Sequence, residues 1–333
     1  MGSQTKSLLL AVAVIATIVP SAASATPPAG EPQTPTQLVT GLAGSSGSTV
    51  GPGGDLYVTE GAAGRISRVD PRTGDITTFA SGLPASIIGI GGAIDVAFIG
   101  SSAYVLVTLV GPDVGGSDVV GIYRVDGPQS FTVIADIGAF SLSHPPSTDF
   151  FVPTGVQYAL ERYRGGFLVT DGHHNRVLRV TLDGTVTELI TFGNVVPTGL
   201  EVRGDTIYMT EAGPVPHLPE TGRVISIDPK STTATEVASG GRLLVDVEFG
   251  RGNTLFALAQ GIFPVGNPDG SPAMPDTGEL LKVNRDGTFT VVAEGLDRPT
   301  SLEIIQNTAY VTTLGGEIWK IEGVSGPPYG GSG

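Results

Sequence analysis

The chain of 333 residues contains no cysteine. Disulfides, thiolate metal sites, cysteine nucleophiles and a lipid-anchoring cysteine are therefore excluded. Basic residues are also scarce, because 18 lysines and arginines stand against 32 aspartates and glutamates. A net charge of −14 repels phosphate backbones and anionic lipid surfaces. Nucleic acid is thus not an expected partner.

Long hydrophobic runs are missing beyond the N-terminus. Residues 7–19, SLLLAVAVIATIV, are too few to span a bilayer, which takes about 20 residues. The small residues Ala23-Ser24-Ala25 follow, in the pattern that signal peptidase accepts. We expect a signal peptide over 1–25, cleavage near Ala25, a secreted (extracellular or periplasmic) protein and no membrane insertion. The alternative, a buried N-terminal helix, would have to continue into the proline-rich stretch 26–35, which we expect to be a linker.

Stretches of helix-forming residues are equally rare, whereas 49 glycines, 25 prolines and many Val, Ile and Thr are present. This composition predicts an all-β protein of short strands and tight turns. An alternating strand recurs six times, as LYVTEG, AYVLVT, FLVTDG, IYMTEA, LFALAQ and AYVTTL. Each copy has a second strand after it, most have a third, and each copy after the first has a further strand ahead of it. Four strands per repeat of about 40 to 60 residues are typical of a β-propeller blade.

We therefore predict a six-bladed propeller of four-stranded antiparallel blades over residues 36–324, followed by a flexible glycine- and proline-rich tail over 325–333. The last copy lacks an outer strand, and TQLVTGL (36–42) has the ending of the other outer strands. We expect this N-terminal strand to complete the last blade and so protect its open edge. Alternatively, 36–42 is a linker.

The motifs G-x-L-Y-V-x-E, G-R-x-x-R-V-D, D-V-A-F and P-T-G-V/L run through the whole mature chain. In these motifs the sequence resembles the secreted ScyD/ScyE family, itself related to NHL-repeat and regucalcin-like propellers. The resemblance implies the propeller fold and no particular chemistry, since members are associated with pigment biosynthesis or have no assigned role. One departure is DFFVPTGV (149–156), where such proteins often carry an Asn-Pro-Tyr-Gly stretch. A role of that asparagine does not transfer to this chain.

Long connections predict which face binds a ligand. In an up-and-down blade, the loop between the second and third strands shares a face with the crossover to the next blade. These connections are the long ones, at 109–120, 141–153, 212–221 and 261–278, whereas the opposite turns are short. Binding residues are therefore expected on the looped face.

The four histidines all fall on this looped face, and with Phe263 they are the predicted ligand-binding residues: His144, His173, His174 and His217. The stretch TDGHHNRV (170–177) predicts a hairpin whose Asp171 and Arg176 pair across the strands, with both imidazoles projecting from the looped face. No H-x-H or H-E-x-x-H spacing is present, so the sequence does not define a histidine metal site.

Carboxylates end the second strand in three blades, at Glu60, Asp171 and Glu211, and an arginine opens the next strand in the same three. We favour cross-strand ion pairs of exposed type, each contributing about 0.2–1 kcal/mol. The alternative is convergence of the carboxylates on a cation, as in regucalcin-like lactonases.

Two further acids, Asp95 and Asp246, align in one column of the innermost strands, where other blades have Gly155, Gly199 and Ser301. Blades two and five face each other, so the two carboxylates are candidate ligands for a divalent cation such as Ca²⁺. Alternatively, each accepts backbone N–H groups of a neighbouring blade.

No G-x-S-x-G elbow, phosphate-binding G-x-x-x-x-G-K or Rossmann fingerprint occurs. Two functions therefore remain open. The preferred one is a secreted binding or scaffold protein whose looped face holds a small molecule, a glycan or an extracellular protein. The alternative is a metal-assisted hydrolase, lactonase or lyase of the regucalcin or streptogramin-lyase type. Propellers support both, so the fold does not choose.

Overall fold

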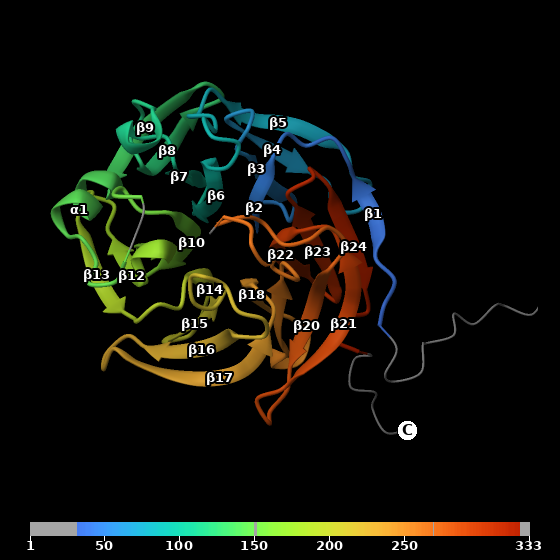
Figure 1. The fold of residues 1–333 in the computed structure, drawn as a ribbon. Coiled ribbons are helices and arrows are strands. Elements are labelled where there is room, and N and C mark those ends of the chain that lie inside the picture. Colours follow the sequence, from blue (N-terminus) through green and yellow to red (C-terminus); the bar gives the residue numbers. More distant parts are fainter. Residues whose placement is uncertain (1–31, 150–151, 269, 327–333) are drawn as a thin grey trace, which may run out of the picture. The chain divides into compact units, whose positions relative to one another are not determined.

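The computed structural model describes residues 32–149, 152–268 and 270–326. The predicted signal peptide, the start of the linker and most of the tail lie outside these residues. Six four-stranded antiparallel sheets surround a central axis, which confirms the predicted six-bladed propeller (Figure 1). Within the described residues, no helix has the length and apolar character needed to cross a membrane.

Each of the first three blades follows chain order from its innermost to its outermost strand. Their strands are β2 (Ser45–Val50), β3 (Leu56–Glu60), β4 (Arg65–Val69) and β5 (Ile76–Ser81); β6 (Gly92–Ile99), β7 (Ser102–Thr108), β8 (Gly121–Gly127) and β9 (Ser130–Asp136); and β10 (Gln157–Tyr163), β11 (Gly166–Asp171), β12 (Arg176–Val180) and β13 (Val186–Thr191). Helix α1 (Ile137–Ser143) begins the crossover from blade two to blade three, and its first turn is capped by the Asp136 side chain, which accepts from Ala139 N–H.

Blades four and five have the same order, and blade six receives its outer strand from the N-terminus. Their strands are β14 (Pro197–Arg203), β15 (Thr206–Glu211), β16 (Gly222–Asp228) and β17 (Thr233–Gly241); β18 (Leu244–Phe249), β19 (Leu255–Ala259), β20 (Gly278–Val283) and β21 (Phe289–Leu296); and β22 (Pro299–Ile305), β23 (Thr308–Thr313), β24 (Ile318–Glu322) and β1 (Thr36–Val39). Short 3₁₀ turns occur at Pro112–Val114, Gly172–His174 and Arg251–Asn253.

β1 is the outer strand of the last sheet. Thr36 lies opposite Lys320, and Leu42 N–H beyond the strand donates to the Gly316 carbonyl at 3.0 Å. Val39 and Leu42 are buried in an apolar cluster that also includes residues of blade one. β1 and the residues after it therefore link the last blade to the first one through a shared core.

The innermost strand of blade one, β2, is a strand that the repeats did not predict. Its sequence, SSGSTV, has no apolar alternation. A polar strand is tolerated here because it lies beside the axis and bonds to its neighbours through hydroxyl groups. Ser48 N–H donates to Ser301 Oγ at 3.1 Å, and Thr59 Oγ1 donates to the Gly47 carbonyl at 3.1 Å.

Side chains bridge all six blade boundaries at the axis, each one bonding the backbone of an innermost strand. Two bridges use carboxylates, and the others use hydroxyl groups. Around the ring they join Thr59 Oγ1 to Ile94 O (3.1 Å), Asp95 Oδ2 to Leu160 N (2.7 Å), Thr170 Oγ1 to Thr198 O (2.6 Å), Thr198 Oγ1 to Leu244 O (2.8 Å), Asp246 Oδ2 to Leu302 N (2.7 Å) and Thr300 Oγ1 to Ser46 O (2.7 Å). Packed apolar clusters fill the space between the blades farther from the axis.

Deletion of β1 should destabilise the propeller. A variant that begins at Ala43 exposes the edge of β24 and removes Val39 from the core between blades six and one. We expect a lower melting temperature and a broader transition in differential scanning calorimetry. Unfolding identical to that of the chain beginning at Thr26 would show that β1 contributes nothing to the fold.

Candidate functional site

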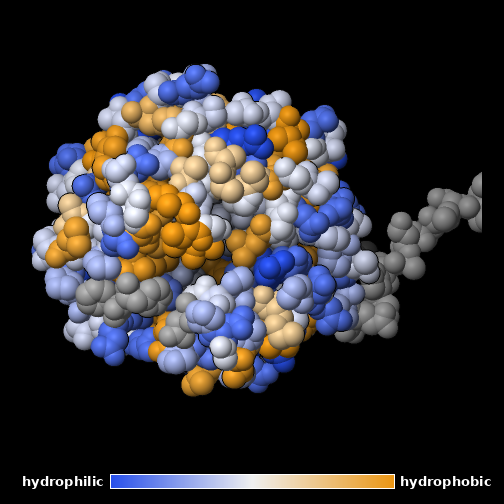
Figure 2. All heavy atoms as spheres, turned by 45° about the horizontal axis from the view of Figure 1, so that its top comes forward, coloured by the Kyte–Doolittle hydropathy of each residue, from blue (hydrophilic) through white to orange (hydrophobic). Residues whose placement is uncertain are grey.

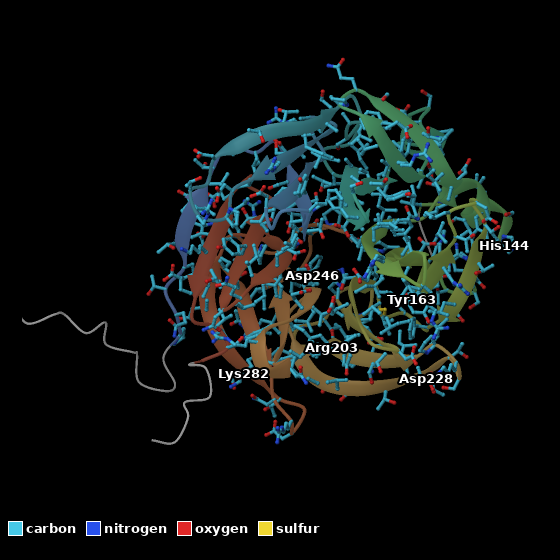
Figure 3. All side chains as sticks on the ribbon, turned by 180° about the vertical axis from the view of Figure 1, so that it is seen from behind. His144, Tyr163, Arg203, Asp228, Asp246 and Lys282 are labelled. Carbon is cyan, nitrogen blue, oxygen red and sulfur yellow. The ribbon has the colours of Figure 1, made fainter. Side chains whose placement is uncertain are left out.

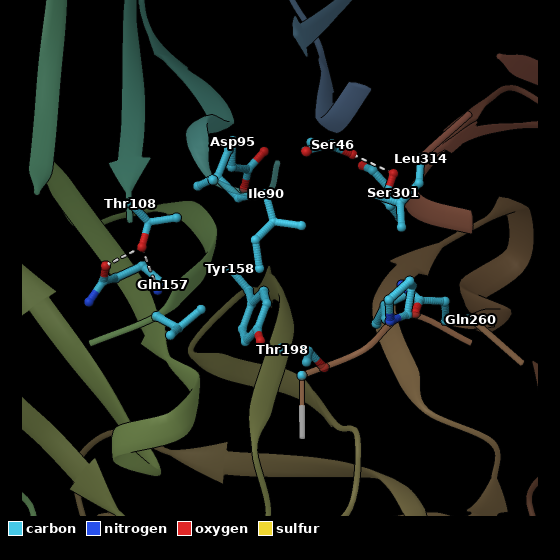
Figure 4. A pocket seen from close by; sticks show the side chains of 18 of the residues that line it. Ser46, Ile90, Asp95, Thr108, Gln157, Tyr158, Thr198, Gln260, Ser301 and Leu314 are labelled. Atoms are coloured by element: carbon cyan, nitrogen blue, oxygen red, sulfur yellow. Dashed lines mark hydrogen bonds between the residues drawn. The ribbon is translucent and has the colours of Figure 1, made fainter. Parts of the chain in front are cut away.

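A cavity of about 370 Å³ opens at the axis on the looped face. Innermost strands and crossovers of all six blades line it, and Figure 4 shows Tyr158, Ile90 and Gln260 around the same space. A cavity of this size holds a small organic molecule. The prediction that the looped face carries a pocket therefore agrees with the structure.

The wall of the cavity is largely apolar. Ile90, Leu109, Val156, Val245 and Leu314 contribute side chains, together with glycine and alanine residues. Among the described residues, no lysine or arginine lines it. An anionic ligand would therefore find no cationic partner here, and a neutral ligand suits the wall better.

One side of the wall carries a phenol and two imidazoles. Tyr158 and His217 line the cavity, and the Tyr158 hydroxyl lies 3.0 Å from Nε2 of His173, which is behind it. Burial lowers the pKa of His173 to about 4, and the neighbouring His217 contributes in the same direction. Burial also raises the pKa of Tyr158 well above its ordinary value. At neutral pH, Tyr158 is therefore a protonated phenol held by an uncharged imidazole.

The expectation that His173 and His174 project from the looped face is wrong. Both are buried, because the crossover from blade two lies over their turn. His174 Nε2 is 3.0 Å from the Val152 carbonyl, and its Nδ1 is 3.1 Å from Asp171. His173 does not titrate near the ordinary histidine pKa of about 6.5, because burial lowers its pKa to about 4.

His144 lies away from the cavity. Figure 3 shows it at the outer edge of the ring, whereas Asp246 lies near the centre. Its ring is exposed and stacks on Phe140 at 4.3 Å between centroids. Phe263 is closer to the site, since its ring meets His217 edge-on at 5.1 Å. Of the five predicted ligand-binding residues, the structure thus places His217 in the wall, with Phe263 against its ring and His173 against the Tyr158 hydroxyl.

The TDGHHNRV hairpin forms as predicted in its backbone. Asp171 and Arg176 are paired across the strands, and Asn175 ends the turn with a φ of 56°. The pair does more than close a hairpin, because Arg176 also donates to Ser141 Oγ (3.0 Å) and to the His144 carbonyl (2.7 Å). It therefore fastens the crossover above it to blade three.

All three predicted acid–arginine pairs are present, at 2.7 Å for Glu60–Arg65, 2.9 Å for Asp171–Arg176 and 2.8 Å for Glu211–Arg223. The prediction that they are exposed is wrong, since the acid side chains are 0%, 0% and 3% accessible. Asp171 is covered by the crossover from blade two, whose Ser141 hydroxyl lies 3.4 Å from its carboxylate, and Glu60 accepts from Ala43 N–H at 2.6 Å. Burial opposes ionisation of Glu60, but bonds from Arg65, Ala43 and Ser67 outweigh it and lower its pKa.

Asp95 and Asp246 hold blades together. Each uses one oxygen for the amide of the following blade and the other for the N–H of its own next residue, Val96 or Val247. Glycines of the preceding blades make room, because a Cβ at Gly47 or Gly199 would overlap the aspartate. The structure thus agrees with the second of the two roles considered from the sequence, in which each aspartate accepts backbone N–H groups of a neighbouring blade.

The strand register corrects one member of the predicted column. Gly155 precedes β10, and Ala159 instead takes the position equivalent to Asp95 and Gly199. Gly155 has a φ of +83°, and a Cβ there would meet Asp171 at 2.2 Å. The P-T-G motif of blade three therefore serves a turn and not the strand.

A divalent cation between Asp95 and Asp246 does not fit these donors. Each of their four carboxylate oxygens already accepts a backbone N–H. Burial raises the pKa of Asp95, and it raises that of Asp246 to about 7, so neither is a strong anionic ligand. Among the described residues, no group of three His, Asp or Glu side chains is arranged to hold a metal ion.

Four glutamates on the innermost strands, which we call the channel glutamates, were not predicted from the sequence. Two positions after the aspartate column, the innermost strands of blades three to six carry Glu161, Glu201, Glu248 and Glu303. Burial raises all four pKa values, to about 8 for Glu161 and about 7 for Glu201, and repulsion from neighbouring acids adds to it. The repeated glutamate in QYALE, TGLEV, VDVEF and TSLEI was the available signal.

No protein-family model matches the chain, and no characterised protein matches it in sequence. Solved structures share its fold. A gluconolactonase from Xanthomonas campestris has a TM-score of 0.60 and 13% identity, with 91% of this chain and 99% of that one covered. Virginiamycin B lyase from Staphylococcus aureus has a TM-score of 0.52 and 14% identity (87% and 98% covered). A catalytically inactive variant of that lyase, with a histidine replaced by alanine and quinupristin present, has a TM-score of 0.50 and 15% identity, again with 87% and 98% covered.

Asp171→Asn should destabilise the protein by about 3–5 kcal/mol, because it leaves the buried Arg176 without its carboxylate partner. Chemical unfolding at pH 7 measures the change. Asp205→Asn is the matched control, since that acid pairs with Arg164 while remaining exposed, and it should have little effect. Equal stability of the two variants would contradict the role assigned to the buried network.

Stability should fall as the pH rises from about 5 to about 8. The channel glutamates bind protons more tightly in the folded state, so their stabilising effect is complete below the unfolded pKa, which lies near 4.5, and is lost as the pH passes about 7 and 8. Urea unfolding at pH 5 and pH 8 tests this in the wild type and in Glu161→Gln/Glu201→Gln. The double variant should show a weaker pH dependence, and an unchanged slope would exclude these two groups as its source.

Proposed function

We propose that the axial cavity binds a small organic molecule and that the protein converts it as a hydrolase or lyase. The carrying observation is that Tyr158 and His217 line the same, largely apolar cavity, which contains no lysine or arginine among its described residues. This is the alternative of the two functions considered from the sequence, with acid–base chemistry by side chains in place of a metal ion.

Tyr158 suits the role of a hydrogen-bond donor. Its raised pKa keeps the phenol protonated, and His173 fixes its orientation from behind. A fixed neutral donor in an apolar cavity stabilises negative charge that develops on a carbonyl oxygen. His173 is accordingly a positioning residue, since Tyr158 stands between it and the cavity.

His217 suits the role of a proton acceptor, because it lines the same cavity and Phe263 holds its ring edge-on. In ester hydrolysis, water would add to the carbonyl carbon and pass a proton to His217. The carbonyl oxygen would accept from Tyr158. When the ester C–O bond breaks, the departing alkoxide would take the proton from His217, so atoms and charge balance.

Two enzymes of the same fold agree with this proposal. The gluconolactonase and the virginiamycin B lyase share the propeller fold, and the inactive lyase variant lacks a histidine. A fold alone does not fix a reaction, so the proposal depends on Tyr158 and His217 in the cavity. Three expectations stay predictions from the sequence: secretion after cleavage near Ala25, membership in the ScyD/ScyE family, and a glycan or protein partner.

The enzyme is tested with a panel of neutral lactones and cyclic depsipeptides, with products followed by liquid chromatography. His217→Asn and Tyr158→Phe should each lower turnover by about 100-fold or more, while His144→Asn, at the outer edge, should not change it. EDTA should have no effect.

Loss of turnover in EDTA with recovery on adding Ca²⁺ would restore the metal-assisted alternative. A wild type that binds panel members without converting any would favour the binding protein. Full activity of both cavity variants would contradict the assigned roles.

A further inference from the structure

Three isoleucines at the mouth of the cavity are left in solvent. Ile87, Ile88 and Ile90 are 46%, 50% and 46% exposed, and they belong to residues 86–91, which we call the isoleucine loop. The loop is part of the crossover from β5 to β6. Figure 2 shows a cluster of hydrophobic residues on the visible face of this acidic protein. Exposed apolar side chains that gather in this way mark interaction sites.

Hydrogen bonds and glycine turns fix the backbone of the isoleucine loop. Ser86 anchors it twice, since its N–H donates to the Gly61 carbonyl (2.9 Å) and its hydroxyl donates to the Ile90 carbonyl (2.7 Å). Gly89 and Gly91, with φ of +87° and +86°, supply the turns that an L-residue rarely adopts. The fixed backbone therefore presents the isoleucines in a defined arrangement.

Ile90 joins the loop to the cavity. Its side chain lies in the cavity beside Tyr158 in Figure 4, and Ser86, Gly89 and Gly91 belong to the same lining. Ile87 lies on the outer side, where a Cβ at Gly116 of the blade-two loop would overlap it. An apolar path thus leads from the space beside Tyr158, past Ile90, to the surface at Ile87 and Ile88.

Among its described residues, this path carries no side chain that would recognise an anion. The described lining contains no lysine or arginine, and its two carboxyls are occupied by backbone amides. Most other polar side chains of the lining bond within the protein: Thr108 bonds Gln157, and the hydroxyls of Ser86, Thr198, Ser271 and Thr300 donate to backbone carbonyls. Tyr158 and His217 belong to the same lining. The site thus recognises a polar group at one end and apolar surface at the other.

We propose that the substrate is a neutral amphiphile that is longer than the cavity. Its polar group lies at Tyr158 and His217, and its hydrocarbon part leaves past Ile90 and rests on Ile87 and Ile88. This inference rests on the proposed function, because it assumes that the cavity is the substrate site. Sugar acids and phosphorylated compounds are poor candidates, since the described lining offers them no lysine or arginine.

The probe for a test is a series of neutral γ-alkyl lactones with side chains of two to ten carbons, titrated by calorimetry. In the wild type, affinity should rise about threefold per added methylene and continue to rise for the longest chains. In Ile87→Ser/Ile88→Ser, the rise should stop once the chain leaves the cavity, so the longest lactone should bind about tenfold more weakly than it does to wild type. The shortest lactone should bind equally well to both.

Two controls separate the loop from the cavity. Ile76→Ser, an equally exposed (42%) isoleucine on the outer strand β5, should leave the whole series unchanged. Ala159→Phe, which fills the cavity from β10, should abolish binding of every member. Circular dichroism and melting temperature verify that each variant is folded.

One outcome would overturn the amphiphile inference and leave the cavity as the site. In it, affinity rises with chain length in the double serine variant as steeply as in wild type, while Ala159→Phe binds no lactone. Binding that survives Ala159→Phe would overturn both proposals. A double serine variant that binds lactones normally but loses self-association in sedimentation would instead assign the isoleucine loop to a second copy of the chain.

Discussion

The free edges of the innermost strands are the constraint on which this structure depends. Six strand edges meet around the axis, and their backbone groups cannot pair with another strand. Six side-chain bridges solve this, with Asp95 and Asp246 as their carboxylate members on opposite sides of the ring. Because each aspartate needs a small residue in the preceding blade, Gly47 and Gly199 follow from the same constraint. Small residues at this level keep the axis open, and the cavity is the space that remains.

The axis of the propeller offers little charge to a ligand. Its acids are buried and have raised pKa values, and its aspartates are occupied by amides, so ionic recognition is weak. Tyr158 stands out because its neighbour His173 is an uncharged imidazole that holds the phenol in place. With His217 in the same lining, the wall offers a phenol donor and an imidazole acceptor to a neutral molecule. The exposed isoleucine loop continues the same apolar character to the surface.

Repeats predicted the blades because each hairpin carries its own alternation and turn residues. β2 was missed, since its role at the axis requires hydroxyl groups and not apolar alternation. The Asp171–Arg176 pair was predicted from hairpin spacing, but its burial was not, because the covering crossover is distant in sequence. Gly155 was misaligned since its P-T-G motif matches Gly199 in letters while the strand begins later. The burial of His173 and His174 could not be predicted either, because the residues that cover them are distant in sequence.

The most direct test of the account is a crystallographic screen of neutral small molecules soaked into crystals of the mature chain. The central claim is that the axial cavity is the ligand site. The account predicts electron density in the cavity, with a ligand oxygen within hydrogen-bond distance of the Tyr158 hydroxyl and apolar atoms against Ile90. Molecules bound only elsewhere on the protein, with no ligand density in the cavity, would contradict the account.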